Sequence, residues 1–216
     1  MGSSGNRSFY FADTWDIELR MSRGAWTRTL AIAETHISIP SPSCVGVVSD
    51  THGSASPSRR SIEFVVAFFK RAGVDFILHA GDVGDASVLD ALGAVAPTAA
   101  VHGNADPRDL IDTLPDRVNI VVGARTVLLL HGHHGKTALK AARAAAAPGI
   151  DLIVFGHSHR SLIEREGQTI LFNPGSPVER RWNPHFGLGL IAISDEAIEP
   201  ELVLFTDRHH LDNVRF

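Results

Sequence analysis

Short apolar runs alternate with longer amphipathic segments over the middle of the chain. The runs are rich in Val, Ile and Leu and predict buried strands, whereas the apolar spacing of the longer segments predicts helices. The expected strands are residues 44–48, 75–79 and 98–102, and the expected helices are 58–72 and 86–95. This alternation implies parallel strands joined by right-handed helical crossovers.

The pattern changes in the second half, where strand-like runs follow one another closely. Residues 117–122 and 125–130 flank a Gly-Ala turn and predict an antiparallel hairpin. A helix is expected over 136–147, and further strands over 151–155, 161–166, 169–172, 187–193 and 199–205. A helix-rich first half and a hairpin-rich second half predict an α/β fold, with two sheets packed face to face and helices outside.

Residues 1–42 do not follow this alternation. Gly2–Gly5 resembles a cloning remnant, Met21 could be a second start, and residues 29–39 show only some strand-like alternation. We therefore expect an N-terminal extension over residues 1–42, a tag or accessory segment, and a folded domain over residues 43–216.

Charge and cysteine content narrow the function classes. The chain of 216 residues has 20 basic and 24 acidic residues, a net charge of −4, which argues against generic nucleic-acid binding. A single cysteine excludes an intramolecular disulfide and fits a reducing compartment. No apolar run approaches the roughly 20 residues that cross a membrane, and no secretory signal is evident, so we expect a cytoplasmic protein.

Twelve histidines stand out against one tyrosine, and several follow the ends of predicted strands together with Asp and Asn. The residues at five successive strand ends are Asp50 and His52, then Asp82, then Asn104, then His131, then His157 and His159. Successive motifs lie between 22 (82 to 104) and 32 (50 to 82) residues apart, about one strand–helix repeat. Because ligands bind at the carboxyl ends of such strands, we expect these side chains to share one rim.

Imidazole, carboxylate and amide donors suit divalent ions such as Mn²⁺, Fe²⁺, Zn²⁺, Co²⁺ and Ni²⁺. Seven donors exceed the needs of one ion with open positions, but they match two ions that share a carboxylate. Two ions about 3.5–4 Å apart can bind a phosphoryl group and activate water. Such a centre would also attract a phosphate anion to an otherwise acidic protein.

The ordered motifs resemble those of the calcineurin-like metallophosphoesterases, whose pattern is D-x-H, G-D-x-x-D, G-N, a lone His and G-H-x-H. The resemblance extends from Cys44 to the C-terminus, and the short loops and Asn173-Pro-Gly-Ser176 are similar to the small bacterial and archaeal phosphodiesterase branch. It implies a four-layer α/β/β/α sandwich with two packed mixed sheets.

The resemblance also implies roles for the seven residues. One metal ion would be held by Asp50, His52 and His159, the other by Asn104, His131 and His157, and both by Asp82. A hydroxide bridging the two ions would attack phosphorus, and Asn104 would also contact the phosphate. Mn²⁺ is the expected ion, with Fe²⁺, Zn²⁺, Ni²⁺ and Co²⁺ as alternatives.

One position departs from the family pattern. Many members continue G-N with a His that assists the leaving group, but this chain has Ala105 there. We therefore expect hydrolysis of small phosphodiesters with activated leaving groups. The alternatives are a phosphomonoesterase and a non-catalytic protein-binding scaffold of the same fold. A homo-oligomer is possible, and the natural substrate is not readable from the motifs.

Other polar residues near the motifs receive structural interpretations. We expect Asp85 to cap a helix and to orient the ligands, and His79 and His102 to be packed and hydrogen-bonded within strands. His133 is expected either to contact substrate or to face outward, and His134 to be exposed.

Overall fold

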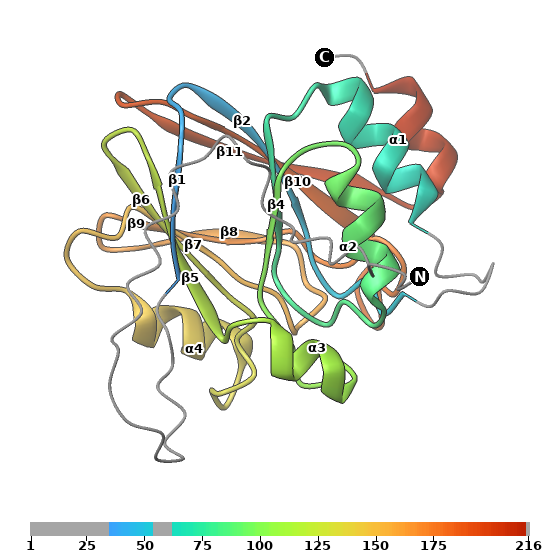
Figure 1. Cartoon of the computed structure of the whole chain (residues 1–216), viewed down its shortest axis with the longest axis horizontal. Coiled ribbons are helices and arrows are strands. Elements are labelled where there is room, and N and C mark those ends of the chain that lie inside the picture. Colours follow the sequence, from blue (N-terminus) through green and yellow to red (C-terminus); the bar gives the residue numbers. More distant parts are fainter. Residues whose placement is uncertain (1–34, 54–61, 215–216) are drawn as a thin grey trace, which may run out of the picture.

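Two β-sheets form the centre of the computed structural model, which describes residues 35–53 and 62–214 (Figure 1). The five-stranded sheet has the order β11-β10-β2-β3-β4, and the six-stranded sheet has the order β1-β5-β6-β7-β9-β8. The strands of the first are β2 (Ser43–Val48), β3 (Phe76–His79), β4 (Thr98–Ala100), β10 (Phe186–Ile193) and β11 (Ile198–Phe205). Those of the second are β1 (Thr35–Ile39), β5 (Arg117–Val122), β6 (Arg125–Leu130), β7 (Leu152–Val154), β8 (Leu162–Glu166) and β9 (Thr169–Asn173).

Helices cover the outer faces of both sheets, which gives four layers. The helices are α1 (Glu63–Ala72), α2 (Ala86–Gly93), α3 (Arg108–Thr113), α4 (Ala138–Ala145) and the 3-10 helix η1 (Arg208–Asn213). Apolar side chains of both sheets, among them Val47 and Phe172, share one buried core between the sheets. Separate apolar clusters join α1 and α2 to the five-stranded sheet and α4 to the six-stranded sheet. The predicted α/β/β/α sandwich is confirmed.

Strand pairing agrees with the expected crossovers. β2, β3 and β4 are parallel, and the chain passes through α1 and α2 between them. β5 and β6 form the expected antiparallel hairpin, in which Arg117 pairs with Leu130 and Val122 with Arg125. Residues 58–61 of the first predicted helix lie outside the described residues. The structure also contains α3 and η1, two short helices that the apolar pattern did not predict.

Part of the expected N-terminal extension takes part in the six-stranded sheet. β1 lies at the edge of that sheet and pairs in parallel with β5, with Thr35 opposite Val118. Ile37 and Ile39 enter the core between the sheets. Residues 1–34, with Gly2–Gly5 and Met21, lie outside the part that the structure describes.

Among the described helices, none combines the length and the apolar character that crossing a membrane requires.

His79 occupies the end of β3 and is fully buried. Its Nε2 lies 2.9 Å from the hydroxyl of Thr51, which donates to the carbonyl oxygen of Val83, so the ring donates from Nε2. Burial lowers the pKa of His79 to about 3, although the charges of Asp50 and Asp82 oppose the shift. The predicted packed, hydrogen-bonded histidine is confirmed at this position.

This buried neutral imidazole makes the folded protein sensitive to acid. The unfolded chain binds a proton at His79 below the ordinary pKa of 6.5, whereas the folded protein does so only near pH 3. Lowering the pH from about 7 to about 5 should therefore remove about 2 kcal/mol of the free energy of unfolding through this group. Urea unfolding in EDTA should show this loss in the wild type and not in His79→Gln. His209→Gln, at an exposed position, should unfold like the wild type, and equal pH dependence in all three proteins would contradict the assignment.

Candidate metal centre

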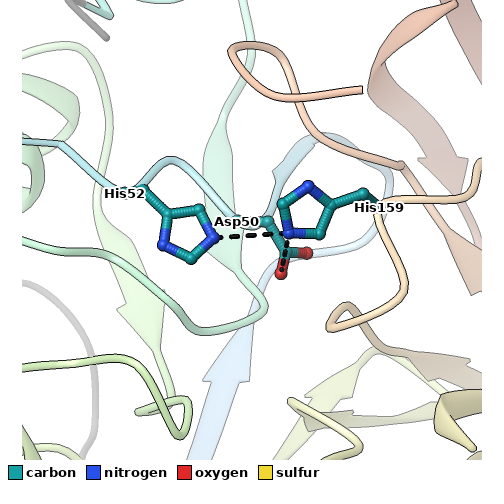
Figure 2. Close-up of side chains that lie close together, drawn as sticks. All are labelled: Asp50, His52 and His159. Carbon is teal, nitrogen blue, oxygen red and sulfur yellow. Dashed lines mark hydrogen bonds and ion pairs between the residues drawn. The ribbon is translucent and has the colours of Figure 1, made fainter. Parts of the chain in front are cut away.

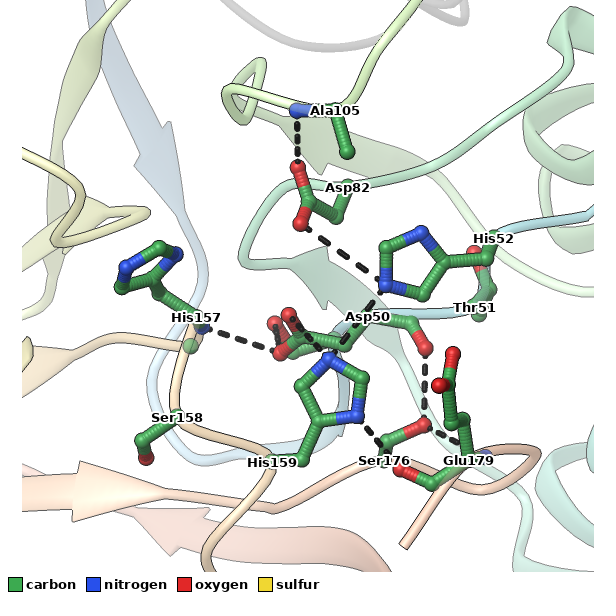
Figure 3. A network of polar contacts seen from close by, with 12 residues as sticks. Asp50, Thr51, His52, Asp82, Ala105, His157, Ser158, His159, Ser176 and Glu179 are labelled. Carbon is green, nitrogen blue, oxygen red and sulfur yellow. Dashed lines mark hydrogen bonds and ion pairs between the residues drawn. The ribbon is translucent and has the colours of Figure 1, made fainter. Parts of the chain in front are cut away.

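The residues that follow the strand ends gather where the two sheets meet. Asp50 and His52 follow β2, and Asp82 follows β3, all from the five-stranded sheet. The other sheet supplies His131 after β6, and His157 and His159 after β7. Figure 3 shows side chains from both sheets pointing toward one another in one space.

Asp50, His52 and His159 form the first group, and one potential ligand atom from each lies within 4.8 Å of the others. Nε2 of His159 is 3.3 Å from Oδ1 of Asp50 and 3.3 Å from Nε2 of His52 (Figure 2). The Asp50 and His159 side chains are buried, and His52 is partly exposed. The group therefore has one side open to a ligand.

Asp82, His131 and His157 form a second group with the same spacing limit. Nε2 of His131 is 3.3 Å from Oδ1 of Asp82, and both side chains are buried. The other carboxylate oxygen, Oδ2, lies 3.7 Å from Nε2 of His52 in the first group. The two oxygens of Asp82 thus face one imidazole from each group.

The imidazole rings of His131 and His159 use Nδ1 for hydrogen bonds to the backbone, so in each ring Nε2 is left to face a carboxylate oxygen. Nδ1 of His131 donates to the carbonyl oxygen of Ala80 at 2.7 Å, and Nδ1 of His159 donates to that of Glu179. In the neutral rings the lone pair on Nε2 therefore faces a carboxylate oxygen. Nε2 of His131 and Oδ1 of Asp50 are buried and have no hydrogen-bond partner among the described residues.

A divalent cation in each group would resolve this arrangement. Metal-binding histidines commonly donate their second ring N–H to a backbone carbonyl, as His131 and His159 do. Imidazole and carboxylate are also the donors that first-row divalent ions prefer. The residues present therefore fit a pair of metal ions.

Burial and the mutual charges of these residues shift their pKa values in different directions. The pKa of Asp82 is lowered overall. Burial alone would raise it, but the facing imidazole of His131 and the N–H of Ala105 outweigh that effect. Burial opposes protonation of His131, yet the carboxylates of Asp82 and Asp50 raise its pKa. Burial lowers the pKa of both His52 and His157. The carboxylate is thus held ionised and the more open imidazoles neutral, as metal ligands require.

Five of the expected metal ligands have a left-handed backbone conformation. The φ angles of Asp50, His52, Asp82, His157 and His159 lie between 42° and 67°. Residues with a side chain rarely adopt this region, and such strain clusters at functional sites. The backbone therefore turns sharply at these positions, which directs consecutive side chains toward the same space.

Asn104 lies beside the second group, but its side chain is exposed. Both of its neighbours touch Asp82, since the N–H of Ala105 donates to Oδ1 at 2.9 Å and Gly103 packs against the carboxylate. The structure brings six of the seven expected ligands into the two groups, and it holds Asn104 between two residues that touch Asp82.

Several residues that support the ligands were not identified from the motifs. Ser49 donates to Oδ2 of Asp50 at 2.7 Å, as does the N–H of His157 at 3.0 Å. Ser176, the last residue of the Asn-Pro-Gly-Ser motif, donates to the carbonyl oxygen of Asp50 at 2.7 Å. Asp106 accepts from the N–H groups of Gly84 and Gly103, at 2.7 and 2.8 Å, and links the loops after β3 and β4. Asp106 could have been noticed because it follows the G-N motif by two residues.

Of the remaining expectations, two are confirmed, one is not supported and one is wrong. Asp85 caps α2 by accepting from the N–H of Ser87 at 2.9 Å, which confirms the predicted helix cap. Among the described residues its side-chain hydrogen bonds are with Ser87 and not with a ligand, so the structure does not support the expected role in orienting the ligands. His134 is 65% exposed, also as expected. His102 lies beyond β4, in the loop, because the strand ends at Ala100. The expectation that it lies within a strand is wrong, although its ring nitrogens do have polar neighbours.

Comparison with known proteins agrees with this geometry. The model of the calcineurin-like phosphoesterase superfamily domain matches residues 44–196. A probable metallophosphoesterase of Methanothermobacter thermautotrophicus is 32% identical over 163 residues, which cover 74% of this chain and 91% of the relative. The phosphodiesterase YfcE of Escherichia coli is 27% identical over 184 residues, which cover 72% and 95%.

Solved structures show the same fold. Zinc-bound Vps29 from Entamoeba histolytica has a TM-score of 0.57 and 21% identity, with coverage of 76% of this chain and 99% of that one. The chain belongs to the calcineurin-like phosphoesterase superfamily, and the resemblance indicated by its motifs is confirmed.

Gly103 provides a test of the geometry around Asp82. A Cβ at this position would lie 2.0 Å from Oδ1 of Asp82, so Gly103→Ala must displace the carboxylate. Loss of a group that only supports a metal ligand typically weakens binding by about 10- to 100-fold, so displacing Asp82 itself should weaken Mn²⁺ binding by at least that much in isothermal titration calorimetry. Gly149→Ala adds the same methyl group where nothing lies within 4 Å; the φ of 89° makes alanine strained there, so this variant should lose some stability but bind Mn²⁺ like the wild type. Unchanged affinity in folded Gly103→Ala would contradict the role assigned to Asp82.

Proposed function

We propose that this protein is a phosphodiesterase that depends on two divalent metal ions, with Mn²⁺ as the preferred pair. The observation that carries the proposal is the position of Asp82, whose two oxygens face His131 at 3.3 Å and His52 at 3.7 Å. A carboxylate between two imidazole groups suits a shared ligand of two ions. When bound, two such ions would activate water and stabilise negative charge on the phosphoryl group.

The protein's own residues would hold this centre in a fixed geometry. Asp50, His52 and His159 would hold one ion, His131 and His157 the other, and Asp82 both. Asn104, at the edge of the second group, would complete it and contact a phosphate oxygen from its exposed position. The Ser49 and Ser176 hydroxyls orient Asp50, so little reorganisation is needed when substrate binds.

An anionic substrate is supported by the surroundings of the exposed side. The charge of Arg181 contributes to the lowered pKa of His157, after burial and the neighbouring His131, so a cationic side chain lies close to the second group. Two ions would exceed the charge of the Asp50 and Asp82 carboxylates and leave a positive centre. A small phosphoester is the substrate class that this charge favours.

A protein-binding scaffold of the same fold is the alternative class. Both groups of potential ligands are present in this chain, and two of their buried atoms, Oδ1 of Asp50 and Nε2 of His131, have no hydrogen-bond partner among the described residues. Burying polar atoms without partners costs stability unless an interaction such as a bound metal ion compensates for it. The ligand set therefore favours the enzyme. A cytoplasmic location stays a prediction, consistent with the unpaired Cys44.

Asp82 and Asp85 form a matched pair for testing the centre. Asp82→Ala removes the shared carboxylate, and its loss of several kcal/mol of transition-state stabilisation should lower hydrolysis of bis-nitrophenyl phosphate by roughly 10³-fold. Asp85→Ala removes an exposed helix cap, so activity should persist while the free energy of unfolding falls by about 1 kcal/mol. EDTA should abolish wild-type activity, and Mn²⁺ should restore it. Chelator-resistant activity, or activity that survives Asp82→Ala, would contradict the proposal.

Ala105 supports the preference for diesters with good leaving groups. Its methyl group can donate no proton, so the wild type should hydrolyse bis-nitrophenyl phosphate faster than the monoester. The side chain is exposed beside Asp82, which leaves room for an imidazole. A positioned general acid contributes about 10²–10⁴-fold, so Ala105→His should raise activity most on unactivated phenyl esters.

The control for that substitution is Ala105→Gln, which fills similar space without a group that titrates near neutral pH. It should leave the leaving-group dependence unchanged. A wild-type preference for the monoester would refute the diester assignment.

A further inference from the structure

Three further polar side chains gather beside the two groups already described. His102, Asp116 and His133 each place one potential ligand atom within 4.8 Å of the others. His102 follows β4 of the five-stranded sheet, whereas Asp116 precedes β5 and His133 follows β6 of the other sheet. All three are partly exposed, so the cluster is accessible from solvent.

The orientation of His102 repeats the arrangement seen at His131. Its Nδ1 is 3.2 Å from the carbonyl oxygen of Gly103, which can only accept, and its Nε2 is 3.1 Å from Oδ1 of Asp116. In the neutral ring with its proton on Nδ1, the Nε2 lone pair faces this carboxylate oxygen. The backbone N–H of His102 donates to the carbonyl oxygen of Pro115 at 3.1 Å, so the two segments are held side by side. Again an acceptor faces an acceptor at a distance that a cation would favour.

His133 supplies the third donor. Its ring centroid is 5.7 Å from that of His102, and its Nδ1 is buried with no hydrogen-bond partner in the described part of the chain. His134 also approaches Oδ1 of Asp116, at 3.0 Å, but it is 65% exposed and lies outside the group of three. An ion pair between Asp116 and His134 would explain the position of the carboxylate without a metal ion. It would not explain the buried Nδ1 of His133, which has no hydrogen-bond partner among the described residues.

We propose that His102, Asp116 and His133 bind a third divalent transition-metal ion, separate from the two held by the Asp50 and Asp82 groups. Two imidazoles and one carboxylate are a donor set that Zn²⁺, Co²⁺ and Ni²⁺ accept, with positions left for water or an anion. The ion would join the loop after β4 to the β5–β6 hairpin and so fasten the two sheets together.

A cavity of about 400 Å³ gives the ion a path to the cluster. Asp116 and His133 lie on its wall, together with the exposed Lys136 and Lys140. The lysines would favour an anion at the open positions of the ion. Both ion and anion can therefore reach the cluster without displacing the apolar core.

The test counts bound Zn²⁺ by elemental analysis after gel filtration of the full-length protein. The wild type should hold three ions, and His102→Ala and His133→Ala should each hold two. His134→Ala removes a neighbouring imidazole that contacts the same carboxylate, and it should keep three. Circular dichroism checks that each variant is folded. Asp116→Asn, at a partly exposed position, removes the carboxylate of the site and should also hold two ions.

A second background separates this site from the proposed catalytic centre. Asp50→Ala/Asp82→Ala should still bind one Zn²⁺, and adding His102→Ala should remove it. If the wild type holds one ion that His102→Ala removes, the third site stands and the two-ion centre fails. If His102→Ala and His133→Ala bind as many ions as the wild type, the third site is refuted.

Discussion

The main physical constraint on this structure is the group of buried acceptor atoms where the two sheets meet. Carboxylate oxygens of Asp50 and Asp82 lie 3.3 Å from imidazole nitrogens whose protons are committed to backbone carbonyls on the far side of the rings. Buried polar groups left without partners cost free energy, and facing acceptors also repel one another. Cations or protons must fill this space, and at neutral pH divalent ions fit the donor set better than additional protons do. The left-handed backbone at five of these residues is a second cost that the same function explains.

Much of this arrangement could be predicted because strand ends are visible in the sequence. The β5–β6 hairpin has the expected bounds, and Asp50, Asp82, His131 and His157 all follow buried strands. Long-range pairing could not be predicted, since nothing in the local pattern of residues 35–39 indicates a parallel partner at 118–122. Hydrogen bonds across more than a hundred residues, such as Ser176 to the backbone of Asp50, were equally invisible. The cluster of His102, Asp116 and His133 was missed because His102 was assigned to a strand interior.

Ala105 links the departure from the family motif to the choice of substrate. Its N–H donates to Asp82, whereas its methyl side chain can donate no proton. The contact that this position makes with Asp82 is present, and under the proposed function only assistance to the leaving group would be missing. The retained ligands favour the proposed enzyme, because hydrolysis of activated diesters would need the ligands and could dispense with the acid. The intact first group around Asp50 points the same way.

Every group of potential ligands contains residues from both sheets, and this couples metal binding to folding. Asp50 and His52 come from the five-stranded sheet and His159 from the other, and the second group is divided in the same way. The distance between ligands is therefore set by the apolar core between the sheets. An ion that binds only the folded arrangement stabilises it by mass action, about 2.7 kcal/mol at a hundredfold excess over Kd. Conversely, a substitution that loosens the core between the sheets would weaken ion binding without touching a ligand, because the core that contains Val47 and Phe172 sets the spacing of the candidate metal centre.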